Sequence, residues 1–279
     1  MIQQISILPA RPLRPYIEEY HWIGNPTVLE DWIEEDNLPM PVSGLCFQFG
    51  GGQPIMISHG EVEKEKLPPG YVLPPSTKRF TVHFRGGVQM LAVIFRPAAF
   101  FEFFGWPLYE FSDQTVPLSD TEGRVEFRSL QEHLQEKKAP AQQALVLDTY
   151  FLQKIKNKKE SNPAILHALA EINKNRGIAR PRHLLAKSGV GSRQLRRLFN
   201  DHLGMPPRDF LRIYRFFSAY WAILSGRFEN LTQLALDNGY YDQAHFIHEF
   251  QEFTGMSPHQ FIKKQFLILD KVAWKNEDN

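Results

Sequence analysis

An internal repeat in the second half of the chain constrains the fold more than any other feature. Residues 184–210 align with residues 234–261, and the two segments read LLAKSGVGSRQLRRLFNDHLGMPPRDF and LALDNGYYDQAHFIHEFQEFTGMSPHQF. The offset is fifty before the turn, where Gly189 matches Gly239, and fifty-one after it. One residue is therefore inserted at the second turn. Self-similarity of this kind indicates two copies of one supersecondary unit.

Each copy predicts a helix, a turn that contains glycine, a second helix and a G-M-x-P stop. This is the layout of a helix-turn-helix. The glycine permits the positive φ that ends the first helix, and Asp242 stands where the second copy needs an N-cap. Between the copies, residues 208–228 (RDFLRIYRFFSAYWAILSGRF) have the spacing of one amphipathic helix. We expect this helix to tie the two units together rigidly.

The second copy contains an H-x-x-H-E motif formed by His245, His248 and Glu249. Residues three apart share one face of a helix, so the motif raises the question of a metal site. Zinc requires three or four ligands, whereas Glu249 points about 100° away from His248 around a helix of 3.6 residues per turn. No cysteine lies nearby, and His202 and His259 follow no metal spacing. We therefore expect no metal here, and the histidines either contact a partner or lie at the surface.

The first half of the chain has the pattern of short strands. Apolar or β-prone runs at 45–50, 54–60, 80–84 and 88–95 are separated by breaks rich in Gly and Pro, which favours a small barrel or sandwich. Helical spacing follows from 121. The polar segment 157–163 is the expected boundary. We thus expect an α+β chain of two domains. They are residues 1–157, with helices after about 120, and residues 163–265, which are all α, followed by a tail at 266–279.

Charge and composition place limits on the partners. The chain of 279 residues has a net charge of only +1, yet residues 174–227 hold twelve basic residues against two acidic ones. That local excess of +10 favours a polyanion. Cys46, the single cysteine, cannot form an internal disulfide, and its apolar surroundings suggest a buried thiol. No apolar run approaches the ~20 residues that span a bilayer. We expect a cytoplasmic protein with no membrane partner.

The repeated units resemble the DNA-binding domain of AraC/XylS-type transcriptional regulators. The resemblance covers residues 163–264 and rests on the two spaced units, the linking helix and the signature GYYDQAHFIHEFQEFTGMSPHQF. Less specifically, LRPYIEEYHW and FRPAAFFEFFGWPLYEFSDQTVPL resemble the sensor domains of that family. The resemblance implies a cupin-like N-terminal β-barrel with helices. It also implies two reading helices in successive major grooves of double-stranded DNA, about one helical turn or ~34 Å apart.

The resemblance assigns DNA contacts to both reading helices. The residues concerned are Ser192, Arg193, Gln194, Arg196 and Arg197 in the first, and Asp242, Gln243, Ala244, His245 and His248 in the second. Arg suits guanine, and Gln suits adenine. Lys187, Arg208, Arg212 and Arg215 are phosphate contacts or solvated surface. The chain departs from the family pattern at two places. Gly191 stands at an N-cap that is usually Ser, and His248 stands where Arg is common.

The sequence thus predicts a sequence-specific transcription regulator whose N-terminal domain binds a small-molecule effector or mediates self-association as a homodimer. RNA polymerase is a further candidate partner. The alternative is a cupin-type enzyme fused to a DNA-binding domain. His21, His59 and His83 are isolated, and the chain has no nucleophile elbow or P-loop. We therefore expect no enzyme activity, no cofactor and no metal. The aromatic residues Trp22, Trp32, Phe47, Phe49 and Phe95 either line a pocket or belong to the core.

The two departures predict that the first unit carries most of the affinity for DNA. A neutral histidine is a weaker phosphate partner than arginine, although it can donate one hydrogen bond. Arg197→Ala should therefore weaken operator binding more than His248→Ala. Titration of both variants against one operator fragment measures this difference, and a larger loss from His248→Ala would contradict the prediction.

Overall fold

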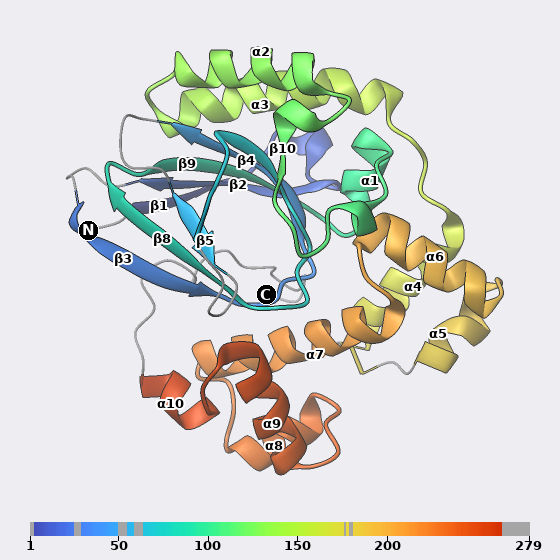
Figure 1. Cartoon of the computed structure of the whole chain (residues 1–279). Helices are drawn as coiled ribbons and strands as arrows, with labels where there is room; N and C mark the ends of the chain where they lie inside the picture. Colours follow the sequence, from blue (N-terminus) through green and yellow to red (C-terminus); the bar gives the residue numbers. More distant parts are fainter. Residues whose placement is uncertain are drawn as a thin grey trace.

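The computed structural model describes residues 3–24, 29–49, 55–58, 64–175, 177–178 and 181–263 (Figure 1). Its first half is rich in β-strands, and everything from residue 163 onward is helical. Several features singled out in the sequence lie outside the described residues. They are His59, Arg176, Arg180, the glycines at 50–52, and residues 264–279.

Two open sheets form the first half, so the α+β class is confirmed but the closed barrel is wrong. The larger sheet has the order β1-β2-β9-β4-β7-β10 and the smaller has the order β3-β8-β5-β6. The strands of the larger sheet are β1 (Gln3–Ile7), β2 (Ile17–Gly24), β9 (Gln89–Phe95), β4 (Ser43–Phe49), β7 (Gly70–Leu73) and β10 (Val116–Pro117). Those of the smaller sheet are β3 (Leu29–Asn37), β8 (Phe80–Gly86), β5 (Met56–Ser58) and β6 (Glu65–Lys66).

Two of the segments that connect one sheet to the other contain residues that disfavour strand pairing, which helps to keep the sheets separate. Residues 38–42 join β3 to β4, and residues 74–79 join β7 to β8. Both segments contain two prolines. Because proline has no backbone N–H, it cannot donate to a strand ladder. Within the described strands, all pairing runs inside one sheet or the other, which makes this domain a sandwich of facing sheets.

Successive side chains along the strands of the larger sheet point to opposite faces, and an apolar layer covers each face. Phe47 in β4 and Tyr20 in β2 pack on the outer face, where α1 (Ala99–Phe104), α2 (Arg124–Gln135) and α3 (Pro140–Lys154) cover them (Figure 1). Cys46, one position away, belongs to the layer between the sheets. This alternation is the period of two that a strand imposes. Short 3-10 helices at Arg11–Leu13, Leu108–Glu110, Leu118–Asp120 and Ile155–Asn157 complete the domain.

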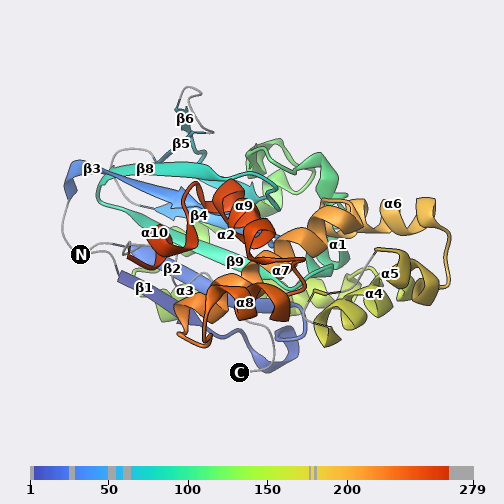
Figure 2. The ribbon, with the colours of Figure 1, turned by 90° about the horizontal axis from the view of Figure 1, so that it is seen from below.

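The helical half contains the two predicted units and the linking helix. Its elements are α4 (Pro163–Lys174), α5 (Pro181–Ser188), α6 (Ser192–Leu203), α7 (Pro207–Leu224), α8 (Leu231–Asp237), α9 (Gln243–Thr254) and α10 (Pro258–Lys263). The Asn162 side chain accepts a hydrogen bond from the Ala164 N–H at 2.9 Å and so caps α4. In Figures 1 and 2, α7 runs along the lower side of the sheets from α6 toward α9.

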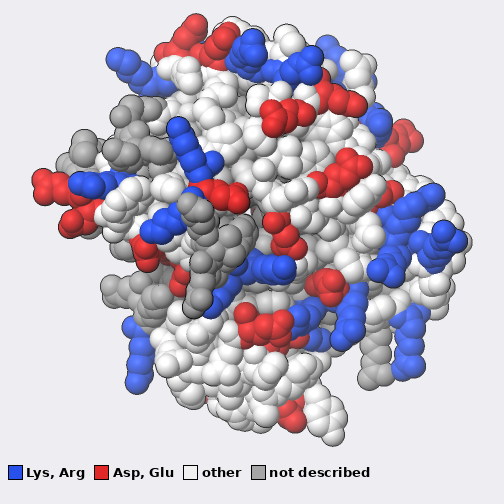
Figure 3. Space-filling view, viewed as in Figure 1, with Lys and Arg blue, Asp and Glu red and all other residues white. Residues whose placement is uncertain are grey.

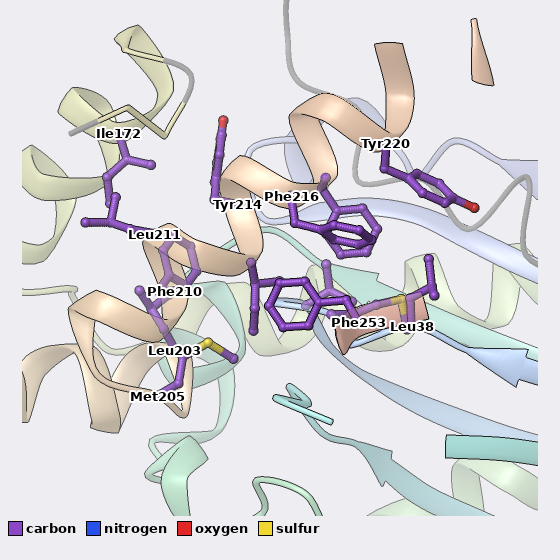
Figure 4. Close-up of a cluster of buried hydrophobic side chains, with 14 of the residues drawn as sticks. Leu38, Ile172, Leu203, Met205, Phe210, Leu211, Tyr214, Phe216, Tyr220 and Phe253 are labelled. Carbon is purple, nitrogen blue, oxygen red and sulfur yellow. The ribbon is translucent and has the colours of Figure 1, made fainter. Parts of the chain in front are cut away.

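The two halves share one apolar core. A continuous cluster of buried side chains runs from the layer between the sheets into the helical half, and it includes Leu38 from the first half and Phe253 from α9 (Figure 4). Phe101 of α1 stacks on His202 of α6 with ring centroids 4.1 Å apart. Burial lowers the pKa of His202, so the neutral imidazole is favoured at this contact. No described helix is long and apolar enough to cross a bilayer.

Candidate DNA interface

The turn of each unit is built as the sequence predicts. Gly189 and Gly239 adopt positive φ of 69° and 73°, which ends the first helix of each pair. The Asp242 carboxylate accepts a hydrogen bond from the His245 N–H at 2.7 Å and caps α9. Gly191 stands at the start of α6 with no side-chain cap. The reading helix of the second unit therefore has the better anchored start.

The α6 helix separates its apolar and polar residues cleanly. Leu195, Leu198 and Phe199 are buried, and Phe199 meets Phe210 of α7 edge-on with ring centroids 5.8 Å apart. The residues on the opposite face, which are Ser192, Arg193, Gln194, Arg196 and Arg197, are all exposed. Figure 3 shows Lys and Arg side chains gathered on the side of the molecule where α5 and α6 lie. The first reading helix thus presents a continuous positive face to solvent.

The α9 helix presents a smaller polar face. Phe246 and Phe250 are fully buried, whereas Asp242, Ala244, His245 and His248 are exposed. Gln243 is half-buried, and its Oε1 accepts a hydrogen bond from Thr232 Oγ1 at 2.7 Å. The structure therefore places nine of the ten predicted DNA-contacting residues on exposed surface. The tenth residue is Gln243, whose side-chain Nε2 can still donate a hydrogen bond to an acceptor outside the helix.

Glu249, the third residue of the H-x-x-H-E motif, has a structural role. Its side chain is only 5% exposed and lies 2.8 Å from Arg212 and 3.0 Å from Arg215. Arg212 also pairs with Glu252, and its guanidinium covers the ring of Phe253. Both arginines of α7 are thus engaged in ion pairs with α9 and are not simply solvated surface. No group of three metal-ligating side chains occurs in the parts of the chain that the structure describes.

The remaining basic candidates differ from one another. Lys187 lies 3.0 Å from Glu171, and its hydrogen bond lowers the pKa of that carboxyl. Arg208 is exposed near the start of α7. Tyr241, which the sequence analysis did not single out, is 86% exposed and directly precedes Asp242. The sequence signal that could have identified Tyr241 is an aromatic residue in a polar turn. Exposure of such a large side chain to water does not stabilise the fold, so its presence there suggests another role.

The aromatic residues named as pocket candidates do not line the space between the sheets. Trp22, Phe47, Phe49 and Phe95 pack in the outer layer, and Trp32 is exposed. Their positions in the strands place these side chains on the face of the sheet that points away from the space between the two sheets. His21 and His83 are not isolated either, because their Nδ1 atoms lie 3.1 Å from Glu19 and 3.0 Å from Glu34, respectively. Cys46 is buried, which raises the pKa of its thiol to about 12 and confirms a structural thiol.

Comparison with known proteins agrees with this arrangement. Residues 184–264 match a family described as a helix-turn-helix domain, and residues 5–117 match a domain of unknown function (DUF6597). The invasion protein InvF of Salmonella typhi is 32% identical over 122 residues, which are 39% of this chain and 55% of InvF. InvF of Salmonella typhimurium (strain LT2) gives the same figures. The chain thus spans about half the length of these relatives.

Two solved structures are also similar to parts of the chain. ToxT from Vibrio cholerae is similar at a TM-score of 0.48 and 9% identity, over 94% of this chain and 98% of ToxT. The C-terminal domain of AraT, a response regulator from Geobacillus stearothermophilus, is similar at a TM-score of 0.35 and 20% identity, over 43% of this chain and all of that domain.

The paired units on one linking helix define the class, which is that of tandem helix-turn-helix proteins. The matched helix-turn-helix family spans residues 184–264, which extend from α5 through α10.

The ion pairs of α7 predict that two arginines of the basic segment respond differently to the same substitution. Arg196→Ala should weaken DNA binding and reduce the slope of log affinity against log salt, by about one if a phosphate contact is lost. Arg212→Ala should instead lower the free energy of unfolding. The loss should be limited to about 1–2 kcal/mol, because Arg215 still faces Glu249. Urea denaturation and salt titration of both variants test this. An unchanged unfolding midpoint for Arg212→Ala would contradict the structural role.

Proposed function

We propose that the protein is a sequence-specific DNA-binding transcription regulator whose two reading helices enter successive major grooves. The observation that carries the proposal is the placement of α6 and α9 on one buried helix, each with an exposed polar face. A major groove admits an α-helix and shows a distinct pattern of donors and acceptors for each base pair. Two readers on one rigid support would read a continuous site from one face of the DNA.

We assign different roles to the residues of the two helices. Arg193, Arg196 and Arg197 would read guanine or bind phosphate, and Gln194 would pair with adenine. Ser192, at the exposed start of α6, would bind backbone phosphate. In α9, Gln243, Ala244 and His245 face the groove, and His248 adds one hydrogen bond at most. Asp242 supports these contacts by holding the first turn of α9.

The proposed domains are residues 1–157 for sensing or self-association and residues 163–265 for DNA binding. The cavity between the two sheets supports an effector role for the first domain. A second copy of the chain and RNA polymerase remain candidate partners, and the protein would act in the cytoplasm. The alternative is the cupin-type enzyme fused to a DNA-binding domain, which no observation on the described residues favours.

Selection of bound sequences from a random DNA pool tests the proposed function. The full-length protein should enrich a site with two conserved blocks about one helical turn apart. A triple variant of α6, with Arg193, Arg196 and Arg197 changed to Ala, should lose the enrichment of one block.

A second triple variant serves as the matched control. It replaces the exposed basic residues Arg124, Arg128 and Lys138 of the first half with Ala and removes the same charge at a distance from α6. It should enrich the same site as the parent protein. Folded protein that binds DNA without enriching any sequence would reduce the function to non-specific binding.

A further inference from the structure

The space between the two sheets holds an apolar cavity of about 110 Å³. Its walls come from both sheets and include Ile57, Phe84, Val88, Met90, Ala92 and Ile94. These side chains belong to the shared apolar core. A cavity with such walls selects mainly apolar molecules, and the few polar groups within it decide which polar substituent is accepted.

His21 contributes an unsatisfied hydrogen-bonding atom to this cavity. Its side chain is fully buried, and its Nδ1 lies 3.1 Å from Glu19 Oε1. A carboxylate only accepts hydrogen bonds, so Nδ1–H faces Glu19, and Nε2 can accept a hydrogen bond when the ring is neutral. Nε2 has no hydrogen-bond partner within the described protein. His21 pairs with Ala92 across the β2–β9 ladder, and both residues line the cavity.

Apart from this histidine, the acidic and basic side chains that line the cavity among the described residues are all carboxylates. Glu35, which is 5% exposed, and Asp113 line it, but no Lys or Arg does among the residues that the structure describes. The Asp113 carboxylate already accepts hydrogen bonds from Thr77 N at 2.8 Å and Thr77 Oγ1 at 2.7 Å. An anionic ligand would lose its hydration without gaining a cation, which is costly in an apolar site.

We propose that this cavity binds a small, mainly apolar molecule that carries a hydrogen-bond donor, such as an alcohol or an amine, and that it discriminates against carboxylates. The ligand's O–H or N–H would donate to His21 Nε2, whose orientation Glu19 holds. Glu35 would add a second acceptor that favours an amine. This assignment rests on the effector role proposed above for the first half of the chain.

Four matched probes test the assignment on the full-length protein by isothermal titration calorimetry. They are benzyl alcohol, benzylamine, benzoate and toluene, which share one ring and differ in the substituent. Benzyl alcohol and benzylamine should each bind at least ~10-fold more tightly than benzoate, the ratio that one buried hydrogen bond supplies. Equal affinities, tighter binding of benzoate, or no binding of any probe by folded protein would overturn the assignment.

Two variants locate the preference at His21. His21→Phe should remove the advantage of benzyl alcohol over toluene. Glu19→Gln should reduce that advantage while leaving the imidazole in place, which keeps the test informative if His21→Phe does not fold. His167→Phe, at an exposed position of α4, is the matched control and should bind as the parent protein does. The DNA selection described above does not depend on these probes, so the two proposals can fail separately.

An independent observation concerns residues 74–80, which comprise the connection from β7 to β8 and Phe80, the first residue of β8. We term these residues the bridging segment. Pro74, Ser76 and Phe80 of this segment line the cavity. Its backbone is tied to two other lining residues, because Ser76 N donates to the Met40 carbonyl at 2.8 Å and Thr77 donates to Asp113. Any molecule that changes the spacing of the sheets must therefore move this segment.

The bridging segment also touches the end of each reading helix. A β-carbon added to Gly204, which ends α6 in the left-handed conformation, would overlap Pro75. A β-carbon added to Gly255, which ends α9 in the same conformation, would overlap the guanidinium of Arg79. A cation at this position is attracted by the last carbonyls of a helix. Ser112, next to Asp113, adds a hydrogen bond to the Gly204 carbonyl at 2.6 Å.

We infer that the bridging segment transmits the state of the cavity to both reading helices, through Pro75 to α6 and through Arg79 to α9. The segment connects the two sheets, so a change in their spacing acts on both helix ends at once. This inference needs no knowledge of the ligand or of the operator, because it concerns contacts within one chain.

Hydrogen exchange in the full-length protein tests the transmission. Ala92→Leu fills the cavity from the larger sheet and should change amide exchange near both Gly204 and Gly255 by at least ~5-fold, a typical coupling between sites. Adding Arg79→Ala should abolish the change near Gly255 and leave the change near Gly204. Adding Lys78→Ala, which alters an exposed neighbour of the same charge, should leave both.

The outcomes separate transmission from a general loss of stability. Changes near Gly255 that survive Arg79→Ala, or no change at either glycine, would overturn the inference. If Ala92→Leu does not fold, Ala92→Val provides a smaller filling change at the same position, and the same Arg79 and Lys78 comparison applies.

Discussion

The burial of α7 is the interaction on which the proposed reading surface depends. Phe210 near its start packs against Phe199 of α6, and Phe216 near its middle packs against Phe250 and Phe253 of α9. Both reading helices are therefore held by aromatic contacts with one continuous helix. Because a helix resists bending and close-packed rings admit little sliding, the separation and orientation of α6 and α9 are set together. The same burial explains why the other face of each helix is exposed to solvent.

The ion pairs beneath α9 explain how the charge of the helical half is distributed. Arg212 and Arg215 of α7 are neutralised by Glu249 and Glu252 of α9, so these charges stabilise the packing of α7 against the second unit. The exposed positive charge of the two reading helices consequently lies on α6, which presents three arginines, whereas α9 presents histidines. The two helices thus have different electrostatic roles despite their common origin in a repeat. A polyanion would be attracted chiefly by the first unit and read by both.

Much of the helical half could be predicted from the sequence because its signals are local. A glycine that ends a helix, an aspartate that caps the next and apolar residues at a spacing of three and four act within a few residues of one another. Four strands of the first half, β4, β5, β8 and β9, were also visible. Their assembly into two open sheets was not, because strand pairing joins residues far apart in the chain and short runs carry no register. The same difficulty explains why Phe47 and Phe95 were candidates for a pocket that their neighbours line instead.

The sequence by itself determined the repeat, the two reading helices, the glycine turns and the exposed arginines of α6. These depend on propensity and periodicity, which a single segment expresses alone. The tertiary structure decided which charges remain available, since only packing places Glu249 between Arg212 and Arg215. It also decided that Pro75 and Arg79 meet the ends of both reading helices while their neighbours line a cavity. The contacts of Pro75 with Gly204 and of Arg79 with Gly255 join residues more than a hundred positions apart, and no local pattern in the chain encodes them.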